Sequence, residues 1–223
     1  MSQGGACHIC LLVHAGLCGN GQCHTSNHPR LRGLPAGTLP GQIPGARQAR
    51  TCPKGQGLLA PVSLKLDETW GLDHGTWAVL THVLPNADIP IVQLSIDERQ
   101  PLSFHYEIGK RLASLREEGI LLIGSGNIVH NLHTYAWGER EVQPFDRAVR
   151  FEKKVRELLL AGEDGPLIEY GKLGHDAMLS VPTPDHYLPL LYVIALRRKG
   201  ETISFLVEGF DGGSVSMLTV LIG

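Results

Sequence analysis

The chain has 223 residues, of which 43% are hydrophobic and 19% are charged, and its formal net charge is −2. This composition is ordinary for a globular protein with a sizeable core, and the weak charge argues against a nucleic-acid binder, which needs clustered Lys and Arg. The sequence holds no apolar run long enough to cross a bilayer and no basic, apolar secretory signal at its start. We therefore expect a cytoplasmic protein without nucleic-acid or membrane partners.

Residues 1–56 differ in composition from the rest of the chain. They contain all five cysteines, whereas the first acidic residue is Asp67 and the first aromatic residue is Trp70. Glycine and proline are frequent there, and few residues could anchor a core or cap a helix. This composition predicts an irregular segment over residues 1–56, followed by an α/β domain over residues 57–223.

A cluster of cysteines and histidines occupies Cys7–His28, "CHICLLVHAGLCGNGQCHTSNH". The spacings Cys7-x2-Cys10 and Cys18-x4-Cys23 are near those of structural zinc sites. A zinc-knuckle binding protein is therefore one hypothesis, which tight stoichiometric binding in a zinc titration of the segment would support. The other interpretation is that the cluster is accidental, because the segment lacks the residues that would order its turns.

Strand and helix patterns alternate in the rest of the chain. They predict strands over residues 88–96, 120–126, 202–210 and 214–223, and helices over residues 101–119, 144–162 and 185–200. A loop is predicted over residues 127–139. The predicted inner face of the 144–162 helix is Val149, Val155, Leu158 and Leu159. This alternation indicates an α/β fold: a single domain with a central, mostly parallel or mixed sheet flanked by helices.

Three histidines occupy positions where functional groups are common. His130 follows the predicted strand 120–126 in "GSGNIVHN", and α/β sheets bind ligands at the carboxyl ends of strands. His74 lies between glycines and tryptophans in "WGLDHGTW", and His186 lies between prolines in "PTPDHYLP". Each also has a purely structural interpretation. His130 can be a histidine beside a turn, and His74 can belong to a loop whose tryptophans fill the core. His186 can be a residue at a helix start next to Asp185. The residues permit a metal site or acid–base catalysis without selecting either.

Five blocks of the sequence carry a family resemblance. They are "WGLDHGTWAVL", "PNADIPIVQLSID", "SGNIVHNL", "PTPDHYLPLLYV" and "GSVSMLTVLIG". In order and spacing they resemble the DODA-type extradiol aromatic ring-opening dioxygenases, class III enzymes related to the catalytic subunit of protocatechuate 4,5-dioxygenase. The resemblance covers about Gly57 to Gly223. It implies an α/β domain that cleaves a catechol-type substrate, DOPA-like or protocatechuate-like, with O2 and a non-haem Fe(2+) or Zn(2+) ion.

The resemblance also implies roles for the three histidines. His130 matches a catalytic acid–base or metal-contacting histidine, and His186 matches a metal ligand. His74 matches a histidine lining the substrate pocket, which we expect to be catalytic with His130. The family's N-terminal metal-binding motifs, "GHGSP" and "SAHW", are missing from this sequence. The alternative is therefore a catalytically inactive remnant or binding protein that lacks those ligands. Ferrous iron binding with O2 uptake on a catechol would distinguish the two.

A shifted reading frame would account for the missing motifs. The stretch "NHPRLRGLP" (Asn27–Pro35), back-translated and shifted by one base, spells TIHDFGGFP, which is typical of the family. We therefore hypothesise that residues 1 to about 54 are an out-of-frame translation. Resequencing the start of the coding DNA tests this, because a corrected frame would remove the cysteines. If the sequence stands, we expect the domain to lack two metal ligands and its first strand.

Overall fold

The computed structural model describes residues 10–14, 18–19, 22–23, 57–62, 74–85 and 91–223. The chain divides into two compact units, and each is built from two separate stretches of sequence. The first unit is Met1–Glu98 with Ser114–Ser125, and the second is Arg99–Ala113 with Gly126–Gly223. The predicted division after residue 56 remains a prediction.

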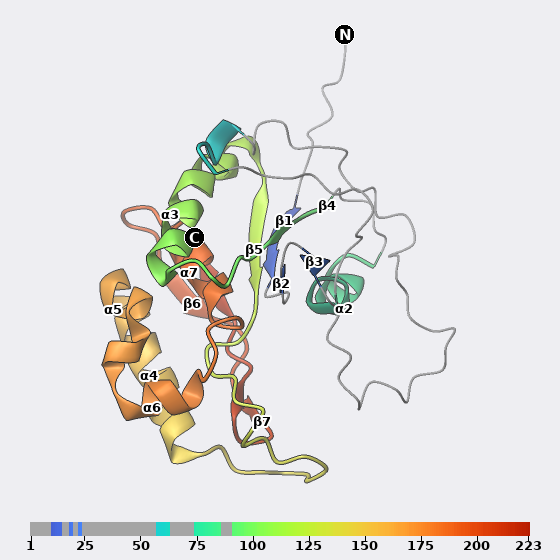
Figure 1. Ribbon diagram of the computed structural model, residues 1–223, viewed down its shortest axis with the longest axis vertical. Coiled ribbons are helices and arrows are strands. Elements are labelled where there is room, and N and C mark those ends of the chain that lie inside the picture. Colours follow the sequence, from blue (N-terminus) through green and yellow to red (C-terminus); the bar gives the residue numbers. More distant parts are fainter. Residues whose placement is uncertain (1–9, 15–17, 20–21, 24–56, 63–73, 86–90) are drawn as a thin grey trace. The chain divides into compact units, whose positions relative to one another are not determined.

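A three-stranded parallel sheet organises the first unit (Figure 1). Its strand order is β4 (Ile91–Ser95), β1 (Cys10–His14) and β5 (Leu121–Ser125), with Cys10 opposite Ile91 and Leu121. β4 and β5 confirm the strands predicted from their short apolar runs. β1 lies within the segment predicted to be irregular, so the expectation of a missing first strand is wrong. The physical reason is its sequence, CLLVH, whose apolar run suits the centre of a parallel sheet.

A helix, α2 (His74–Val83), is tied to this sheet by polar side chains. The Thr76 hydroxyl donates a hydrogen bond to Gln93 Oε1 of β4 over 2.7 Å. The Ser125 hydroxyl, at the end of β5, donates to the Gly75 carbonyl oxygen over 3.1 Å. The first turn of α2 is therefore held against the middle of β4 and the carboxyl end of β5. A further antiparallel pair, β2 (Cys18–Gly19) with β3 (Gln22–Cys23), places the backbones of Cys18 and Cys23 opposite each other.

Helices form most of the second unit (Figure 1). They are α3 (Leu102–Leu112), α4 (Asp146–Ala161), α5 (Asp164–Ile168), α6 (His175–Ser180) and α7 (Leu188–Ile194), with a 3-10 turn at Tyr170–Leu173. α3 packs against α7, and α4 against α6. The first pair approaches closely because Gly109 has no side chain: a Cβ there would lie 2.6 Å from the Tyr192 carbonyl oxygen. His105 is fully buried where α3 meets α7, with Nδ1 2.9 Å from the Tyr192 hydroxyl.

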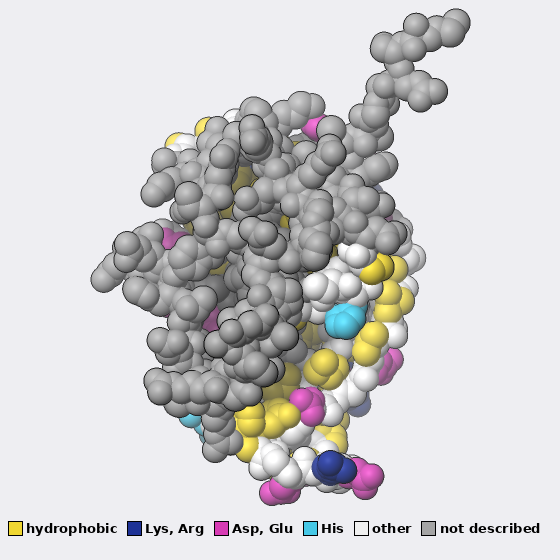
Figure 2. All heavy atoms as spheres, turned by 90° about the vertical axis from the view of Figure 1, so that its right-hand side faces the viewer, with side chains coloured by type: hydrophobic (Ala, Val, Ile, Leu, Met, Phe, Trp, Pro, Cys, Tyr) yellow, Lys and Arg dark blue, Asp and Glu magenta, His cyan; other side chains and the backbone are white. Residues whose placement is uncertain are grey.

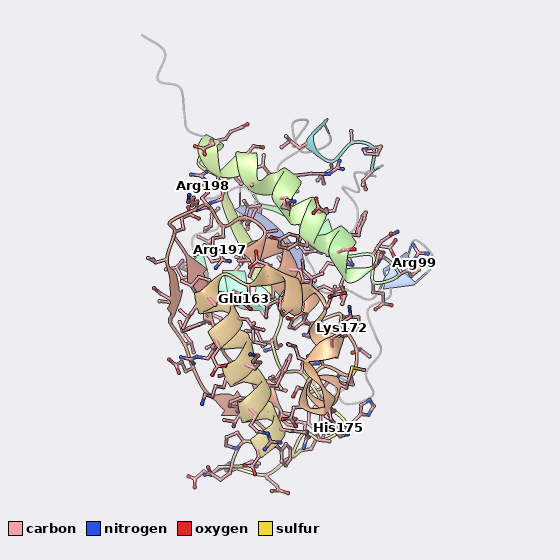
Figure 3. All side chains as sticks on the ribbon, turned by 90° about the vertical axis from the view of Figure 1, so that its left-hand side faces the viewer. Arg99, Glu163, Lys172, His175, Arg197 and Arg198 are labelled. Carbon is pink, nitrogen blue, oxygen red and sulfur yellow. The ribbon has the colours of Figure 1, made fainter. Side chains whose placement is uncertain are left out.

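The buried face of α4 differs by one residue from its prediction. Val155, Leu158 and Leu159 are buried as expected, but Val149 is 41% exposed. Ala148 and Phe151 are buried in its place, because the helical repeat puts these residues, not Val149, in line with Val155. α4 ends at Gly162, whose φ of 75° suits glycine. Figure 3 shows Arg197 near this end of the helix and His175 near the other.

The C-terminal residues form two short antiparallel pairs. β6 (Ile203–Phe205) pairs with β9 (Val220–Ile222), and β7 (Phe210–Asp211) pairs with β8 (Val215–Ser216). Each of the two predicted C-terminal strands is therefore interrupted, and they pair with one another. Gly209, which has a positive φ, interrupts the first of them, and Gly212 and Gly213, also with positive φ, lie in the turn between β7 and β8. The mixture of helices and strands is confirmed, whereas the covering of the sheet by helices remains a prediction.

The surface of the described residues is mixed in character. Figure 2 shows hydrophobic side chains exposed on one face beside acidic and basic ones. Exposed hydrophobic residues of the C-terminal strands and their turns are Leu206, Val207, Met217 and Leu221. Within the described part of the chain, no helix is sufficiently long and apolar to span a membrane.

Candidate active site

The loop that follows β5 carries His130 against the C-terminal strands. His130 forms an isolated antiparallel bridge with Val215 of β8, and its backbone N–H donates to the Ser180 carbonyl oxygen over 2.9 Å. Its neighbour Val129 is fully buried and accepts a hydrogen bond from the Ser216 N–H. The backbone of His130 is therefore fixed on both sides, at the position just beyond a strand that the sequence predicts.

Gly126 allows the His130 loop to approach the turn that holds His186. A Cβ at this position would lie 2.2 Å from the His186 carbonyl oxygen and 3.0 Å from Pro189 Cγ. The next residue, Asn127, donates its N–H to the same carbonyl oxygen over 2.9 Å. No side chain larger than hydrogen fits there without moving one backbone away from the other. This close approach joins two sequence segments that the resemblance treats as separate blocks.

His186 lies in a rigid turn ahead of α7. The N–H groups of Tyr187 and Leu188 both donate to the Pro184 carbonyl oxygen, and Pro189 occupies the first turn of the helix. Tyr187 is fully buried, and its hydroxyl donates to the Leu167 carbonyl oxygen over 3.0 Å. The backbone that carries the His186 imidazole is therefore held in place on both sides of the turn.

The two imidazoles form a stacked pair. The ring centroids of His130 and His186 are 3.6 Å apart, and the planes are inclined by 16°. Burial lowers the pKa of His130, and the nearby Asp185 carboxylate opposes this shift only in part. The Asp185 carboxylate also lies 3.7 Å from His186 Nε2. A neutral imidazole can accept a proton, so His130 suits proton acceptance near neutral pH.

The donor set suits a metal ion in its chemistry but is incomplete among the described residues. Imidazole nitrogens with a carboxylate are typical ligands of iron and zinc. A ligand nitrogen must lie about 2.0–2.1 Å from zinc, with the ion near the plane of its ring. An ion bound by both rings would have to lie near both ring planes. Planes that are inclined by only 16°, with centroids 3.6 Å apart, intersect much farther from the rings than a metal–nitrogen bond reaches. One of the two rings can hold an ion in this arrangement, and no group of three His, Cys, Asp or Glu among the described residues could complete its coordination.

His74 is held at the carboxyl end of the parallel sheet. It begins α2, and the hydrogen bond from Ser125 to Gly75 fixes the adjacent residue. The side chain of His74 lies outside the described residues, so its predicted place in the substrate pocket remains a prediction. The structure brings together His130 and His186, and does not relate His74 to them.

His14 is a candidate that the sequence analysis placed only in the Cys7–His28 cluster, and not at the end of a strand. It is the last residue of β1, opposite Ser95 of β4 and Ser125 of β5. A histidine at the end of a central parallel strand occupies a place where α/β folds bind ligands. The signal was the apolar run before it, which the unusual composition of residues 1–56 obscured. Its side chain lies outside the described residues, as do those of the cysteines, so the zinc-knuckle hypothesis also remains a prediction.

Four other histidines whose side chains the structure describes have surroundings that suit structural or solvent-exposed positions. His82, His133 and His175 are exposed, and His105 is buried beside Tyr192. None of them was assigned chemistry from the sequence, and none lies in the stacked pair. The candidate site within the second unit is therefore the pair His130–His186 with Asp185 beside it.

Comparisons with known proteins agree with the family resemblance. The chain is 50% identical over 171 residues to the 4,5-DOPA dioxygenase extradiol of Escherichia coli K12, a match that covers 74% of this chain and 62% of that protein. The enzyme of the same name from Beta vulgaris is 31% identical over 154 residues, which cover 69% of this chain and 57% of the relative. The matched region thus spans less than two thirds of the length of these relatives.

A solved structure is also similar over almost the whole chain. The crystal structure of an uncharacterized protein from Escherichia coli K12 matches with a TM-score of 0.77 and 36% identity, covering 97% of this chain and 86% of that one. Residues 46–214 match the family described as the catalytic LigB subunit of aromatic ring-opening dioxygenase. That match includes His74, His130 and His186. The chain belongs to this family of aromatic ring-opening dioxygenases.

Proposed function

We propose that the chain is an extradiol ring-cleaving dioxygenase, which inserts both atoms of O2 into a catechol-type substrate beside its hydroxyl groups. The substrate would be DOPA-like or protocatechuate-like, and the cofactor a non-haem Fe(2+) or Zn(2+) ion. The observation that carries the proposal is the stacked pair His130–His186, which Gly126 allows to form within the region that matches the family. The names of the relatives, 4,5-DOPA dioxygenase extradiol, support the same reaction class.

The two histidines take different roles in this proposal. His186 holds the metal ion, because its backbone is fixed in the turn before α7 and a carboxylate lies beside its ring. When bound, the ion supplies Lewis acidity towards the catechol oxygens and, as iron, the redox chemistry with O2. His130 accepts a proton from a catechol hydroxyl through its neutral imidazole and later returns it. Burial of His130, which lowers its pKa, keeps the ring unprotonated near neutral pH.

The test uses the full chain loaded with ferrous iron, with an oxygen electrode and with DOPA and protocatechuate as probes. We expect O2 uptake with one of the two substrates. His130→Gln should lower kcat by about 10²–10⁴-fold, the usual contribution of a general acid–base, while iron remains bound. His186→Ala should weaken iron binding by at least about tenfold, the lower limit seen even for groups that only support a ligand. His175→Gln, an exposed histidine outside the pair, is the control and should change neither quantity. Saturating iron without O2 uptake on either probe would contradict the proposal.

A second candidate function is a catalytically inactive binding protein. It is favoured by the missing "GHGSP" and "SAHW" motifs and by the absence, among the described residues, of three side chains grouped to hold a metal. Such a protein would bind a catechol without consuming O2. Equilibrium binding of both probes to the iron-loaded chain, measured beside O2 uptake, separates the two functions.

A further inference from the structure

A buried carboxylate on α4 has no part in the chemistry described so far. Glu152 is only 7% exposed and lies on the inner face of the helix. Burying a carboxylate is costly unless it is paired and hydrogen-bonded. Its closest cation, Arg156, has Nη1 3.8 Å from Glu152 Oε1 and is engaged more closely by Glu208, at 2.7 Å. The shortest interaction of Glu152 is instead the hydrogen bond that its Oε2 accepts from the Ser216 hydroxyl.

Ser216 connects Glu152 to the loop that carries His130. It is 1% exposed on β8, and its hydroxyl also accepts a hydrogen bond from the Leu218 N–H over 3.1 Å. Its backbone N–H donates to the Val129 carbonyl oxygen over 2.9 Å. Its own carbonyl oxygen accepts from Asn127 Nδ2 over 2.8 Å. Ser216 is thus hydrogen-bonded to two residues of one short loop and to the buried acid beneath it.

Each of the two loop residues bonded to Ser216, Val129 and Asn127, is linked directly to a histidine of the site. Val129 immediately precedes His130, and the Asn127 N–H donates to the His186 carbonyl oxygen over 2.9 Å. The two rings that these backbones carry are stacked at 3.6 Å. Displacement of Ser216 would therefore act on the backbones that carry both rings.

We propose that Glu152 is a positioning residue for the His130–His186 pair, acting through its hydrogen bond to Ser216. A catalytic benefit of this positioning rests on the proposed function, whereas the positioning of the two rings does not. The competing explanation is that Glu152 only joins α4 to β8. In that case, its removal would lower stability and leave the stacked rings unchanged in the folded protein.

NMR of the ring protons of the two histidines, in the metal-free full chain, distinguishes a positioning role of Glu152 from a purely structural one. Each stacked imidazole shields the protons of the other, so both sets should lie upfield of their unstacked values in the wild type. Their assignment follows from His130→Gln and His186→Gln. Glu152→Ala removes the acceptor, whereas Glu152→Gln keeps an oxygen to which Ser216 can donate. Glu157→Ala is the matched control, because Glu157 is exposed on the same helix.

We expect Glu152→Ala and Ser216→Ala to shift both sets of ring protons towards unstacked values and to lower kcat at least about tenfold, with a smaller change in KM. Glu152→Gln and Glu157→Ala should retain the wild-type shifts and kcat within about twofold. Ring shifts that stay at wild-type values in folded Glu152→Ala would overturn the proposal. If that variant does not fold, wild-type shifts in Ser216→Ala would overturn it equally. If the wild type takes up no O2 but the ring shifts respond as expected, the proposed function fails while the positioning role stands.

Discussion

Gly126→Ala tests whether the close approach of two backbones holds the candidate site together. The new Cβ would lie 2.2 Å from the His186 carbonyl oxygen, and a real Cβ essentially never comes within 3.0 Å of another heavy atom. The two segments must therefore separate by at least 3.0 − 2.2 = 0.8 Å. A backbone carbonyl cannot rotate out of the way as a flexible side chain would. The substitution is thus expected to act on both segments.

Separating the two segments lowers the free energy of unfolding in two ways. Overpacking of a well-packed interior costs about 1–3 kcal/mol. Lengthening the 2.9 Å hydrogen bond from Asn127 to the His186 carbonyl oxygen removes about 0.5–1.5 kcal/mol more. We expect Gly126→Ala to lower the free energy of unfolding by roughly 1.5–4.5 kcal/mol. It should also remove the stacking shift of the two histidine rings.

Urea denaturation followed by circular dichroism measures the stability, and NMR of the ring protons measures the stack. Gly165→Ala in α5 is the matched control, because a Cβ there meets nothing within 4 Å. That control should be neutral or more stable by up to about 1 kcal/mol, since alanine favours a helix more than glycine does. A Gly126→Ala protein with the denaturation midpoint and ring shifts of the wild type would refute the reasoning.

Three smaller predictions concern single interactions. Tyr187→Phe should lower the free energy of unfolding by about 1–3 kcal/mol in urea denaturation, because the Leu167 carbonyl oxygen loses its buried donor; an unchanged midpoint would mean that this bond contributes nothing. Burial lowers the pKa of His130 below 6.5, so His130 binds a proton more readily in the unfolded chain than in the folded one. The free energy of unfolding should therefore fall as the pH drops from above 6.5 towards the folded-state pKa. His130→Gln should flatten this pH dependence. An equally steep fall in that variant would assign the effect to another group. Arg150→Ala should leave the urea denaturation midpoint close to that of the wild type, since its bond to Asp176 is exposed; a clear loss of stability in the same assay would show that the pair is more than a surface interaction.

The local elements of the fold were predictable where the sequence pattern is short and clear. β4 and β5 follow from apolar runs, and α7 follows from a pattern that tolerates Pro189 in its first turn. Errors arose where tertiary packing decides. Val149 fits the apolar pattern of α4 but lies one position away from the line of residues that the core buries.

The candidate site was predictable in its residues but not in its geometry. His130 and His186 stand out through their position after a strand and between prolines. Their stacking depends on the missing Cβ of Gly126 and on hydrogen bonds between distant segments, which no local pattern encodes. The supporting role of Ser216 gave no sequence signal, because an isolated serine in a strand is common. β1 was missed because the composition of residues 1–56 outweighed the five-residue run that forms it.

The central claim, extradiol cleavage, is tested most directly by the mass of the product. The iron-loaded full chain is incubated with a catechol that it binds, under O2, and the product is measured by mass spectrometry. The proposed function predicts a product whose mass equals that of the substrate plus both oxygen atoms, less one water where an amine of the substrate condenses with the new aldehyde, and a strong loss of this product in His130→Gln. Recovery of unchanged substrate, or of a product that has lost hydrogen and gained no oxygen, would contradict it.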